Sequence, residues 1–376
     1  ASGAELVARW NAELRDLGYR DAAGPAALAS TQVAWINRDG TADWTLAQLS
    51  AKRSAWNVAD IRGAVEVLIA EANVVATPAA RIELAEDITA RAVARCASLL
   101  ASSDVPEHIR SLTSQQVLDV EDDILRRLAR RGERPAKRIR ATSRGLVRID
   151  PSQSAVVGTL AGSGQLVVVE GAAGAGKTTA LRATHELLST YGNRLLVVTP
   201  TLKAAEVAAA ETGAEGHSAA WLIHQHGWRW DGEGHWTRKP DAQPAAAAQL
   251  RPGDLLLVDE AGMLDQDTAR ALLTVADEGG ARVAFMGDRH QLPAVGRGGV
   301  LDHAVGYANP ATVVTLESVR RFSDPAYAIL SLRMREGYLS GEVFDALVAR
   351  GQVVVHSSDV ERTATLARWG AAGDLV

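Results

Sequence analysis

The pattern of apolar and polar positions changes near residue 150. Before this point apolar residues recur at helical spacing, as in "WTLAQLSAKRSAWNVADIRGAVEVLIAEANV" and "ARIELAEDITARAVARCASLL". After it, short apolar runs alternate with Ala-rich helical segments. The runs are "QLVVVE", "RLLVVTP", "DLLLVDE", "RVAFMGD" and "ATVVTLE". Such alternation is typical of βαβ units, so we predict an α/β domain with a parallel sheet covered by helices on both faces.

The same change of pattern predicts how the chain is divided. We expect a mostly helical N-terminal domain at 1–125, in which Trp35, Trp44 and Trp56 fill the core and Thr45 or Asp60 caps a helix. A basic linker follows at 126–148, which carries ten basic residues and one acid. The α/β domain is expected at 149–316, and residues 317–376 are expected to begin a second domain.

A tryptophan-rich insertion lies inside the α/β domain. "HGWRWDGEGHWTR", near 226–238, alternates aromatic residues around Asp231-Gly232 and predicts a β-hairpin. Trp228, Trp230 and Trp236 either stack on nucleic-acid bases or pack on the domain surface. The arginines of 126–148 likewise either contact phosphates or form a solvated surface.

Composition excludes several classes of protein. Apolar residues make up 47% and charged residues 23% of the chain, as in ordinary globular proteins. The net charge of −5 excludes a uniformly basic nucleic-acid binder, so any such role falls to local patches. The single cysteine, Cys96, excludes a disulfide framework and a Cys-rich zinc site, and is compatible with the cytoplasm. The apolar runs are shorter than a membrane span, so we expect no membrane insertion.

A phosphate-binding loop follows the first apolar run. "GAAGAGKT" has the spacing G-x-x-x-x-G-K-T, in which backbone N–H groups and a helix start face phosphate oxygens. Lys177 is expected to reach the β- and γ-phosphates, and Thr178 to bind Mg²⁺. The nucleotide-binding residues are Gly171, Ala172, Ala173, Gly174, Ala175, Gly176, Lys177, Thr178 and Thr179.

Two further motifs place polar side chains after apolar runs. Asp259 and Glu260 end the run in "DLLLVDEAGML". We expect Asp259 to hold Mg²⁺ and Glu260 to deprotonate the attacking water, because the carboxyl ends of parallel strands face the phosphates. Gln291, in "FMGDRHQLPAVGRGG", is placed to sense the γ-phosphate.

This set of motifs resembles superfamily 1 DNA helicases of the RecD-like branch. Within that branch it is similar to the helicase portion of conjugative relaxase–helicases of the MobF class, the TraI/TrwC type. The likeness covers about 150–322 in motif order, from "DPSQSAVVG" through "VVTPTLKAAEVA" to "LESVRRF". It implies a RecA-like P-loop NTPase domain that binds ATP and Mg²⁺, followed by the start of a second RecA-like domain.

The resemblance also implies roles for single residues. Gln153 would recognise adenine, and Arg321, with Arg320 as a substitute, would approach the γ-phosphate. The expected contacts with single-stranded DNA are Thr201, Lys203 and His290. His290 and His217 also have a purely structural interpretation beside the motifs.

The implied function is an ATP-dependent motor on single-stranded DNA, with 5′→3′ polarity from the resemblance alone. The alternatives are a non-hydrolysing module that acts as a scaffold in a DNA-transfer complex, and a P-loop ATPase of another line.

Two departures from the family matter. The nine histidines include no cluster of three, so we expect no nicking domain, and no pattern for motifs V and VI follows "LESVRRF". We therefore expect a piece of a larger protein, or a truncated relative, with weak ATP hydrolysis. Its partners would be other parts of that protein or a DNA-transfer complex.

Overall fold

The structure is a computed structural model that describes residues 3–18, 30–101, 105–140, 149–171, 175–231, 236–291, 294, 296–316, 324–337 and 339–372. Contacts divide the chain into two compact units, Ala1–Gln115 and Gln116–Val376. Among the described residues, no helix combines the length and the apolar character needed to cross a membrane.

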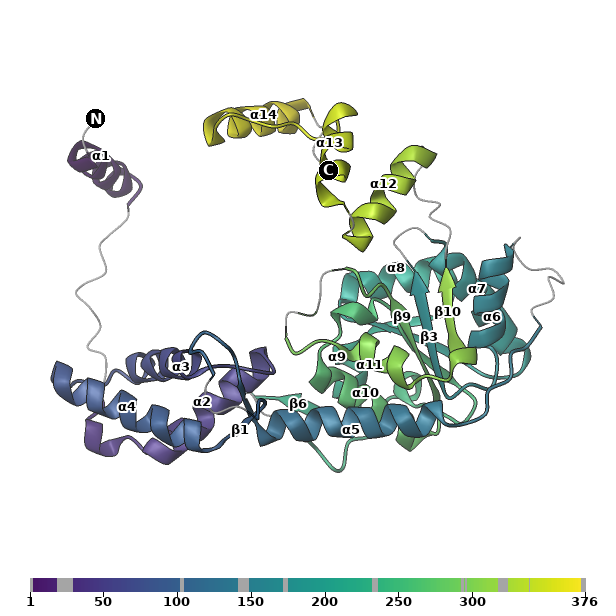
Figure 1. Ribbon diagram of the computed structural model, residues 1–376, viewed down its shortest axis with the longest axis horizontal. Coiled ribbons are helices and arrows are strands. Elements are labelled where there is room, and N and C mark those ends of the chain that lie inside the picture. Colours follow the sequence, from purple (N-terminus) through teal and green to yellow (C-terminus); the bar gives the residue numbers. More distant parts are fainter. Residues whose placement is uncertain are drawn as a thin grey trace. The chain divides into compact units, whose positions relative to one another are not determined.

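The N-terminal unit is mostly helical, as expected. Its elements are α1 (Gly3–Asp16), the 3₁₀ turn η1 (Val33–Trp35), α2 (Arg38–Lys52), α3 (Val58–Glu71), α4 (Pro78–Ala94), β1 (Cys96–Ser98) and β2 (Leu112–Ser114) (Figure 1). Helices α2, α3 and α4 pack on one another through residues spaced three or four apart, such as Ile61 with Val65 and Leu84 with Ile88. Strands β1 and β2 form a short antiparallel pair.

The helix starts in this unit correct one local expectation. Asn37 caps α2, so Thr45 lies inside that helix, where its hydroxyl donates to the Thr41 carbonyl oxygen at 2.7 Å. Asn57 caps α3, and Asp60 completes a capping box with it from the third helical position. Asparagine is as good an N-cap as serine or aspartate, so both caps follow known preferences.

The three tryptophans expected in this core behave differently. Trp56 is fully buried, and its indole nitrogen lies 3.3 Å from the sulfur of Cys96. Trp44 is half-buried. Trp35 is 71% exposed, so the expectation that it fills the core is wrong. It lies on the short turn η1, which packs no residue into the interior.

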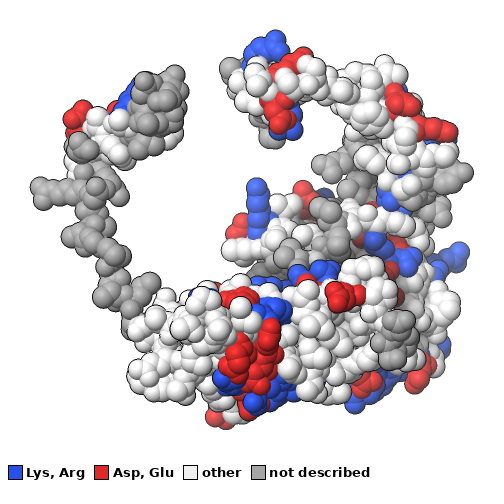
Figure 2. Space-filling view, turned by 60° about the vertical axis from the view of Figure 1, so that its left-hand side comes forward, with Lys and Arg blue, Asp and Glu red and all other residues white. Residues whose placement is uncertain are grey.

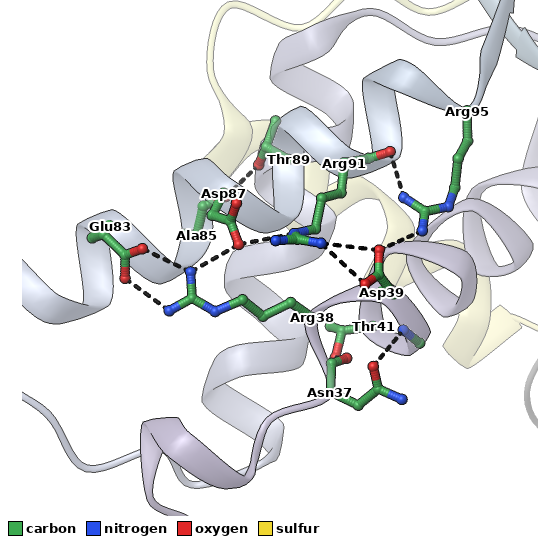
Figure 3. A network of polar contacts seen from close by, with 11 residues as sticks. Asn37, Arg38, Asp39, Thr41, Glu83, Ala85, Asp87, Thr89, Arg91 and Arg95 are labelled. Carbon is green, nitrogen blue, oxygen red and sulfur yellow. Dashed lines mark hydrogen bonds and ion pairs between the residues drawn. The ribbon is translucent and has the colours of Figure 1, made fainter.

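A chain of ion pairs joins α2 to α4 on the surface of this unit, as Figure 3 shows. Arginines and carboxylates alternate along it, and both helices supply both charges. The pairs are Arg38–Glu83 (2.7 Å), Arg38–Asp87 (2.8 Å), Arg91–Asp87 (2.9 Å), Arg91–Asp39 (3.0 Å) and Arg95–Asp39 (2.5 Å).

The second unit contains a six-stranded sheet in which every strand pair is parallel. Its strands, in spatial order, are β10 (Val313–Leu316), β3 (Leu166–Gly171), β9 (Arg282–Gly287), β8 (Leu255–Val258), β4 (Leu195–Thr199) and β5 (Glu215–Ser218). All five predicted strands are confirmed. The edge strand β5 is an addition, because its sequence "EGHS" has no apolar run.

Helices cover both faces of this sheet (Figure 1). One face packs against α5 (Gln115–Gly132), α9 (Ala219–Gln225), α10 (Gln266–Gly279) and α11 (Val300–Tyr307). The other packs against α6 (Pro151–Leu160), α7 (Lys177–Thr190) and α8 (Leu202–Thr212). Three short 3₁₀ turns complete the connections: η2 (Ala246–Ala248), η3 (Ala261–Met263) and η4 (Pro310–Thr312).

Successive residues of each inner strand enter opposite cores. In β3, Val168 belongs to the core under α10, whereas Val167 and Val169 belong to the core under α7. A strand buried on both faces needs apolar residues at every position, which explains the unbroken runs in the sequence. The predicted α/β fold class is therefore confirmed.

The segment expected as a basic linker begins inside a packed helix. Ile124 and Leu128, four residues apart on α5, are fully buried against the sheet. The guanidinium of Arg131 donates to Asp277 on α10 at 2.7 Å and to the carbonyl oxygen of Ala281 at 3.0 Å. Residues 126–132 are thus part of the domain and not a linker, because the helical apolar spacing continues through the arginine run.

The tryptophan-rich insertion forms the predicted hairpin. Strands β6 (Trp228–Trp230) and β7 (Trp236–Arg238) pair antiparallel, with Trp230 opposite Trp236. Trp228 and Trp236 pack against the core under α10, which supports the packing interpretation for these two rings. Trp230 is 48% exposed and stays a candidate for base stacking.

Three helices follow the sheet: α12 (Pro325–Glu336), α13 (Ser340–Ala349) and α14 (Asp359–Ala372). The Nε of Arg335 on α12 donates to both carboxylate oxygens of Asp288, at 2.9 and 2.7 Å. Asp288 directly follows β9, so this pair ties α12 to the sheet. Assignment of these helices to a second RecA-like domain stays a prediction.

Candidate nucleotide site

The candidate site lies where the inner strands of the sheet end. Because the strands are parallel, the ends of β3, β8, β9 and β4 meet at one edge. The chain leaves β3 for α7 on one face, but leaves β8 and β9 for α10 and α11 on the other. A crevice at such a switch point is the usual ligand site of an open α/β sheet.

The phosphate-binding loop leads from β3 into α7. Gly176 has a left-handed backbone, with φ of 85°, and stands directly before the first helical residue, Lys177. No side chain caps the helix, so the first N–H groups of α7 are available to a phosphate. Ala175 is buried under the loop. Ala172, Ala173 and Gly174 lie outside the described residues, and Thr179 is half-buried in the first turn.

Lys177, Asp259 and Glu260 come together at this edge. The ammonium of Lys177 lies 3.9 Å from Oε1 of Glu260, and its side chain is 11% exposed. The N–H of Glu260 donates to Oδ1 of Asp259 at 2.9 Å. Burial raises the pKa of Asp259, Lys177 opposes this shift, and the neighbouring charge of Glu260 adds to it. The fold therefore holds Asp259 where burial disfavours the ionised carboxylate more than its partners favour it.

The backbone of Glu260 is strained. Its φ of 55° and ψ of 39° lie in the left-handed region, which residues other than glycine seldom adopt. Only Asn73 and Leu339 share a positive φ among the non-glycine residues that the structure describes. Such strain is concentrated at functional sites, and here it falls on the residue whose carboxylate lies near the ammonium of Lys177.

A groove of about 360 Å³ begins at these acids and runs between α7 and α8. Its polar lining comprises Thr178, Thr201, Lys203, Glu211, Thr212, Asp259 and Glu260. The hydroxyl of Thr178 donates to Oε2 of Glu211 at 3.1 Å. Glu211 was missed in the sequence because it lies in an Ala-rich helix, 33 residues beyond Thr178.

Gln153 contacts the phosphate loop directly. Its Nε2 donates to the carbonyl oxygen of Gly176 at 3.3 Å, and its Oε1 accepts from the N–H of Asp150 at 3.1 Å. The side chain is almost fully buried. Both ends of the amide are engaged in the protein, so recognition of adenine by Gln153 stays a prediction.

Gln291 lies on the other side of the edge. With Asp288, Arg289 and Asp302 it lines a second cavity of about 50 Å³, apart from the groove that holds Asp259. Its role as a γ-phosphate sensor stays a prediction. His290 is exposed, and its N–H donates to Oδ1 of Asp288 at 3.0 Å.

An ion pair that the sequence did not reveal links the loop after β9 to the phosphate loop. Nε of Arg289 lies 2.6 Å from Oε1 of Glu170, and Nη1 lies 3.5 Å from Oδ1 of Asp302 on α11. Glu170 is the residue before Gly171, and it is largely buried at the end of β3. The only signal was a carboxylate at the end of an otherwise apolar run.

The expected DNA-contact residues lie close to the acids. Thr201 caps α8 and accepts from the N–H of Ala204 at 3.3 Å, while Lys203 is exposed. Both line the groove that contains Asp259. Arg320 and Arg321 lie outside the described residues. His217 stacks on Trp221, with ring centroids 3.8 Å apart, which agrees with its structural interpretation.

Comparison with known proteins places this geometry in a family. The AAA domain family matches residues 148–358, which is more than half of the chain. The chain belongs to the AAA domain family. The match includes the whole sheet and all the site residues named above.

Curated relatives of this AAA domain include a probable conjugal transfer protein TraA of Sinorhizobium fredii. It is 28% identical over 211 residues, which are 55% of this chain and 17% of that protein. The ATP-dependent RecD2 DNA helicase of Deinococcus radiodurans is 32% identical over 173 residues, 46% of this chain and 22% of that protein. The matched part is thus about a fifth of either relative's length.

Among solved structures, the Pif1 helicase of Candida albicans is similar to this chain with a TM-score of 0.41 and 20% identity. The likeness covers 57% of this chain and 50% of that one.

Proposed function

We propose that this chain is the ATP-binding motor region of a superfamily 1 DNA helicase or translocase from a conjugative relaxase-type protein. The observation that carries the proposal is the meeting of Lys177, Asp259 and Glu260 at the switch point, beside an uncapped helix start. The likeness to proteins named as a conjugal transfer protein and a DNA helicase supports the helicase and conjugation parts of the proposal.

The residues fit a magnesium–nucleotide complex. Thr178 and Asp259 offer a hydroxyl and a carboxylate, which are the hard oxygen ligands that Mg²⁺ prefers. In the described part of the chain, no three His, Cys, Asp or Glu side chains form a closed metal site. That suits Mg²⁺, which binds one or two protein oxygens and takes the rest from phosphates and water. When bound, the ion would neutralise charge on the transferred phosphoryl group.

Each residue then has a stated task. The N–H groups at the start of α7 and the ammonium of Lys177 hold the phosphates. Glu260 is 38% exposed at the mouth of the groove, where it can accept a proton from water. Thr178 and Asp259 orient the cation. Hydrolysis would change the grip of the domain on single-stranded DNA.

We test hydrolysis by steady-state release of phosphate, with and without single-stranded DNA. Glu260→Gln should lower turnover by about 10²–10⁴-fold, because general-base catalysis contributes that much, while ADP still binds. The matched control is Glu206→Gln, on the exposed surface of α8. Equal rates for the wild type and Glu260→Gln would favour the non-hydrolysing scaffold.

DNA binding is tested separately. In the face drawn in Figure 2, acidic and basic side chains are interspersed. Lys203→Ala should flatten the slope of log affinity against log salt by about 0.7, the value for one phosphate of a single strand. Fluorescence anisotropy measures the slope, and Lys52→Ala on α2 is the control. Absence of binding at low salt would remove DNA from the proposal.

A further inference from the structure

Glu211 occupies an unusual place on its helix. It is in the last turn of α8, which ends at Thr212 before Gly213 in a left-handed conformation. A carboxylate at a helix C-terminus faces the negative end of the helix dipole, so local preferences disfavour it there. The position is therefore better explained by what lies beside it than by the helix that carries it.

Two contacts from α7 fix Glu211 in place. Arg182 donates to its main-chain carbonyl oxygen, from Nε at 3.0 Å, and thereby satisfies an end carbonyl of α8. The hydroxyl of Thr178, one helical turn before Arg182, donates to its side chain at 3.1 Å. The first two turns of the nucleotide helix thus hold Glu211 by both its backbone and its carboxylate.

The direction of this hydrogen bond has a chemical consequence. A threonine hydroxyl has one proton and two lone pairs. With the proton directed to Glu211, the lone pairs are left for a cation. Asp259, the other candidate ligand, accepts a hydrogen bond from the N–H of Glu260. The hydroxyl proton of Thr178 goes to Glu211 and not to Asp259.

The charges along the groove also favour a cation beside Thr178. Three carboxylates line it, those of Glu211, Asp259 and Glu260, against the ammonium groups of Lys203 at the rim and Lys177 nearby. Groups that orient metal ligands without touching the metal are as characteristic of metal sites as the ligands themselves.

We propose that Glu211 is a positioning residue for the magnesium ion, which accepts the proton of Thr178 and so turns the hydroxyl lone pairs toward the cation. The inference rests on the proposed function, since it needs a magnesium–nucleotide complex at Thr178. It adds a residue from α8 to the site, so the helix that carries Lys203 in its first turn would be linked to the cation through Thr178.

The test is calorimetric binding of ADP and of a non-hydrolysable ATP analogue to the full chain, with Mg²⁺ and with EDTA. Glu211→Gln should weaken binding in Mg²⁺ by about 10–100-fold, the usual effect of disturbing a group that orients a metal ligand. An amide can donate to the Thr178 hydroxyl as well as accept from it, so it no longer fixes the direction of that hydrogen bond. Binding in EDTA should be unchanged. Glu206→Gln, which removes the same charge from the same helix, should change neither.

A second comparison isolates the hydroxyl. In a Thr178→Val background the proton donor is gone, so Glu211→Gln should have no further effect in Mg²⁺. An additive loss in that background would overturn the inference. So would tighter binding by Glu211→Gln in Mg²⁺, since Glu211 would then be a competitor for Thr178.

The two levels of proposal fail in different ways. A wild-type chain that binds neither nucleotide in Mg²⁺ contradicts the proposed function. A wild type that binds in Mg²⁺, with Glu211→Gln binding equally well, contradicts only the role of Glu211.

Discussion

The ion-pair network of the N-terminal unit and the carboxyl edge of the sheet use charge in opposite ways. In the network, each carboxylate has an arginine within hydrogen-bond distance, and the arginines hold the pKa values of Asp39, Glu83 and Asp87 below the ordinary range. At the edge of the sheet, burial raises the pKa of Asp259, whose nearest cation is shared with Glu260.

The opposite pKa shifts distinguish carboxylates that stabilise the fold from a carboxylate whose charge is available to bind a ligand. A lowered carboxyl pKa means that the folded state favours the ionised group, whereas a raised one means that the fold holds it at a cost. Buried groups with unfavourable shifts cluster at functional sites. This contrast gives three predictions, in which the same kind of substitution has different results in the two regions.

The largest effect is expected for Asp259→Asn. Turnover should fall by about 10²–10³-fold, comparable to the loss of one electrostatic stabiliser in other enzymes. The variant should nevertheless melt at a higher temperature at pH 7. Because the pKa of Asp259 is raised in the folded state, the wild type loses stability as the pH rises and this carboxyl ionises. The Asn side chain never ionises, so the variant does not undergo this loss.

Thermal melting without nucleotide, repeated from pH 7 toward about pH 4, measures this stability difference. The advantage of Asp259→Asn should shrink as the wild-type carboxyl is protonated. A variant that melts below the wild type at pH 7 would place Asp259 among the supporting charges instead.

An intermediate effect is expected for Arg289→Gln, which breaks the pair with Glu170. We expect a loss of about 1 kcal/mol in the free energy of unfolding, because Glu170 is largely buried but Arg289 is partly exposed. Nucleotide affinity should also fall, since Glu170 precedes the phosphate loop.

Urea unfolding and calorimetry measure the two effects. The matched control is Arg110→Gln, which breaks a pair with Asp60 at 2.9 Å on the surface of the N-terminal unit. It should cost less stability and leave nucleotide binding unchanged. If both variants bound nucleotide like the wild type, the pair of Arg289 would be purely structural.

The smallest effect is expected for Asp39→Asn in the network. Its lowered pKa contributes stability above about pH 4, which is lost as the pH falls through the folded value. The variant should melt at a slightly lower temperature than the wild type at pH 7 in low salt. This difference should vanish at a pH below the folded pKa of Asp39, or in about 1 M salt. Nucleotide binding should be unchanged. A difference that persists in high salt would mean that the pair stabilises by more than exposed charge.

The sequence was sufficient where one physical rule determines the outcome. Inner strands buried on both faces must be apolar throughout, so five of the six strands were predicted, and the phosphate loop and the Asp259–Glu260 pair followed from their positions after strands. Strand β5 was missed because an edge position tolerates the polar residues of "EGHS". The contacts of Glu211 with Thr178 and of Arg289 with Glu170 depend on how distant elements pack, which no local pattern encodes.

The edges of the sheet also bear on aggregation. The inner strands β3, β9, β8 and β4 are runs of valine, leucine and similar residues, which pair readily with other chains when exposed. They are covered at one edge by β5, a four-residue polar strand whose Glu215 pairs with Arg194 at 3.2 Å. At the other edge β10 is equally short and follows Pro310. Short, charged or proline-flanked edges are poor templates for another strand, so aggregation of this domain should require prior unfolding of the sheet.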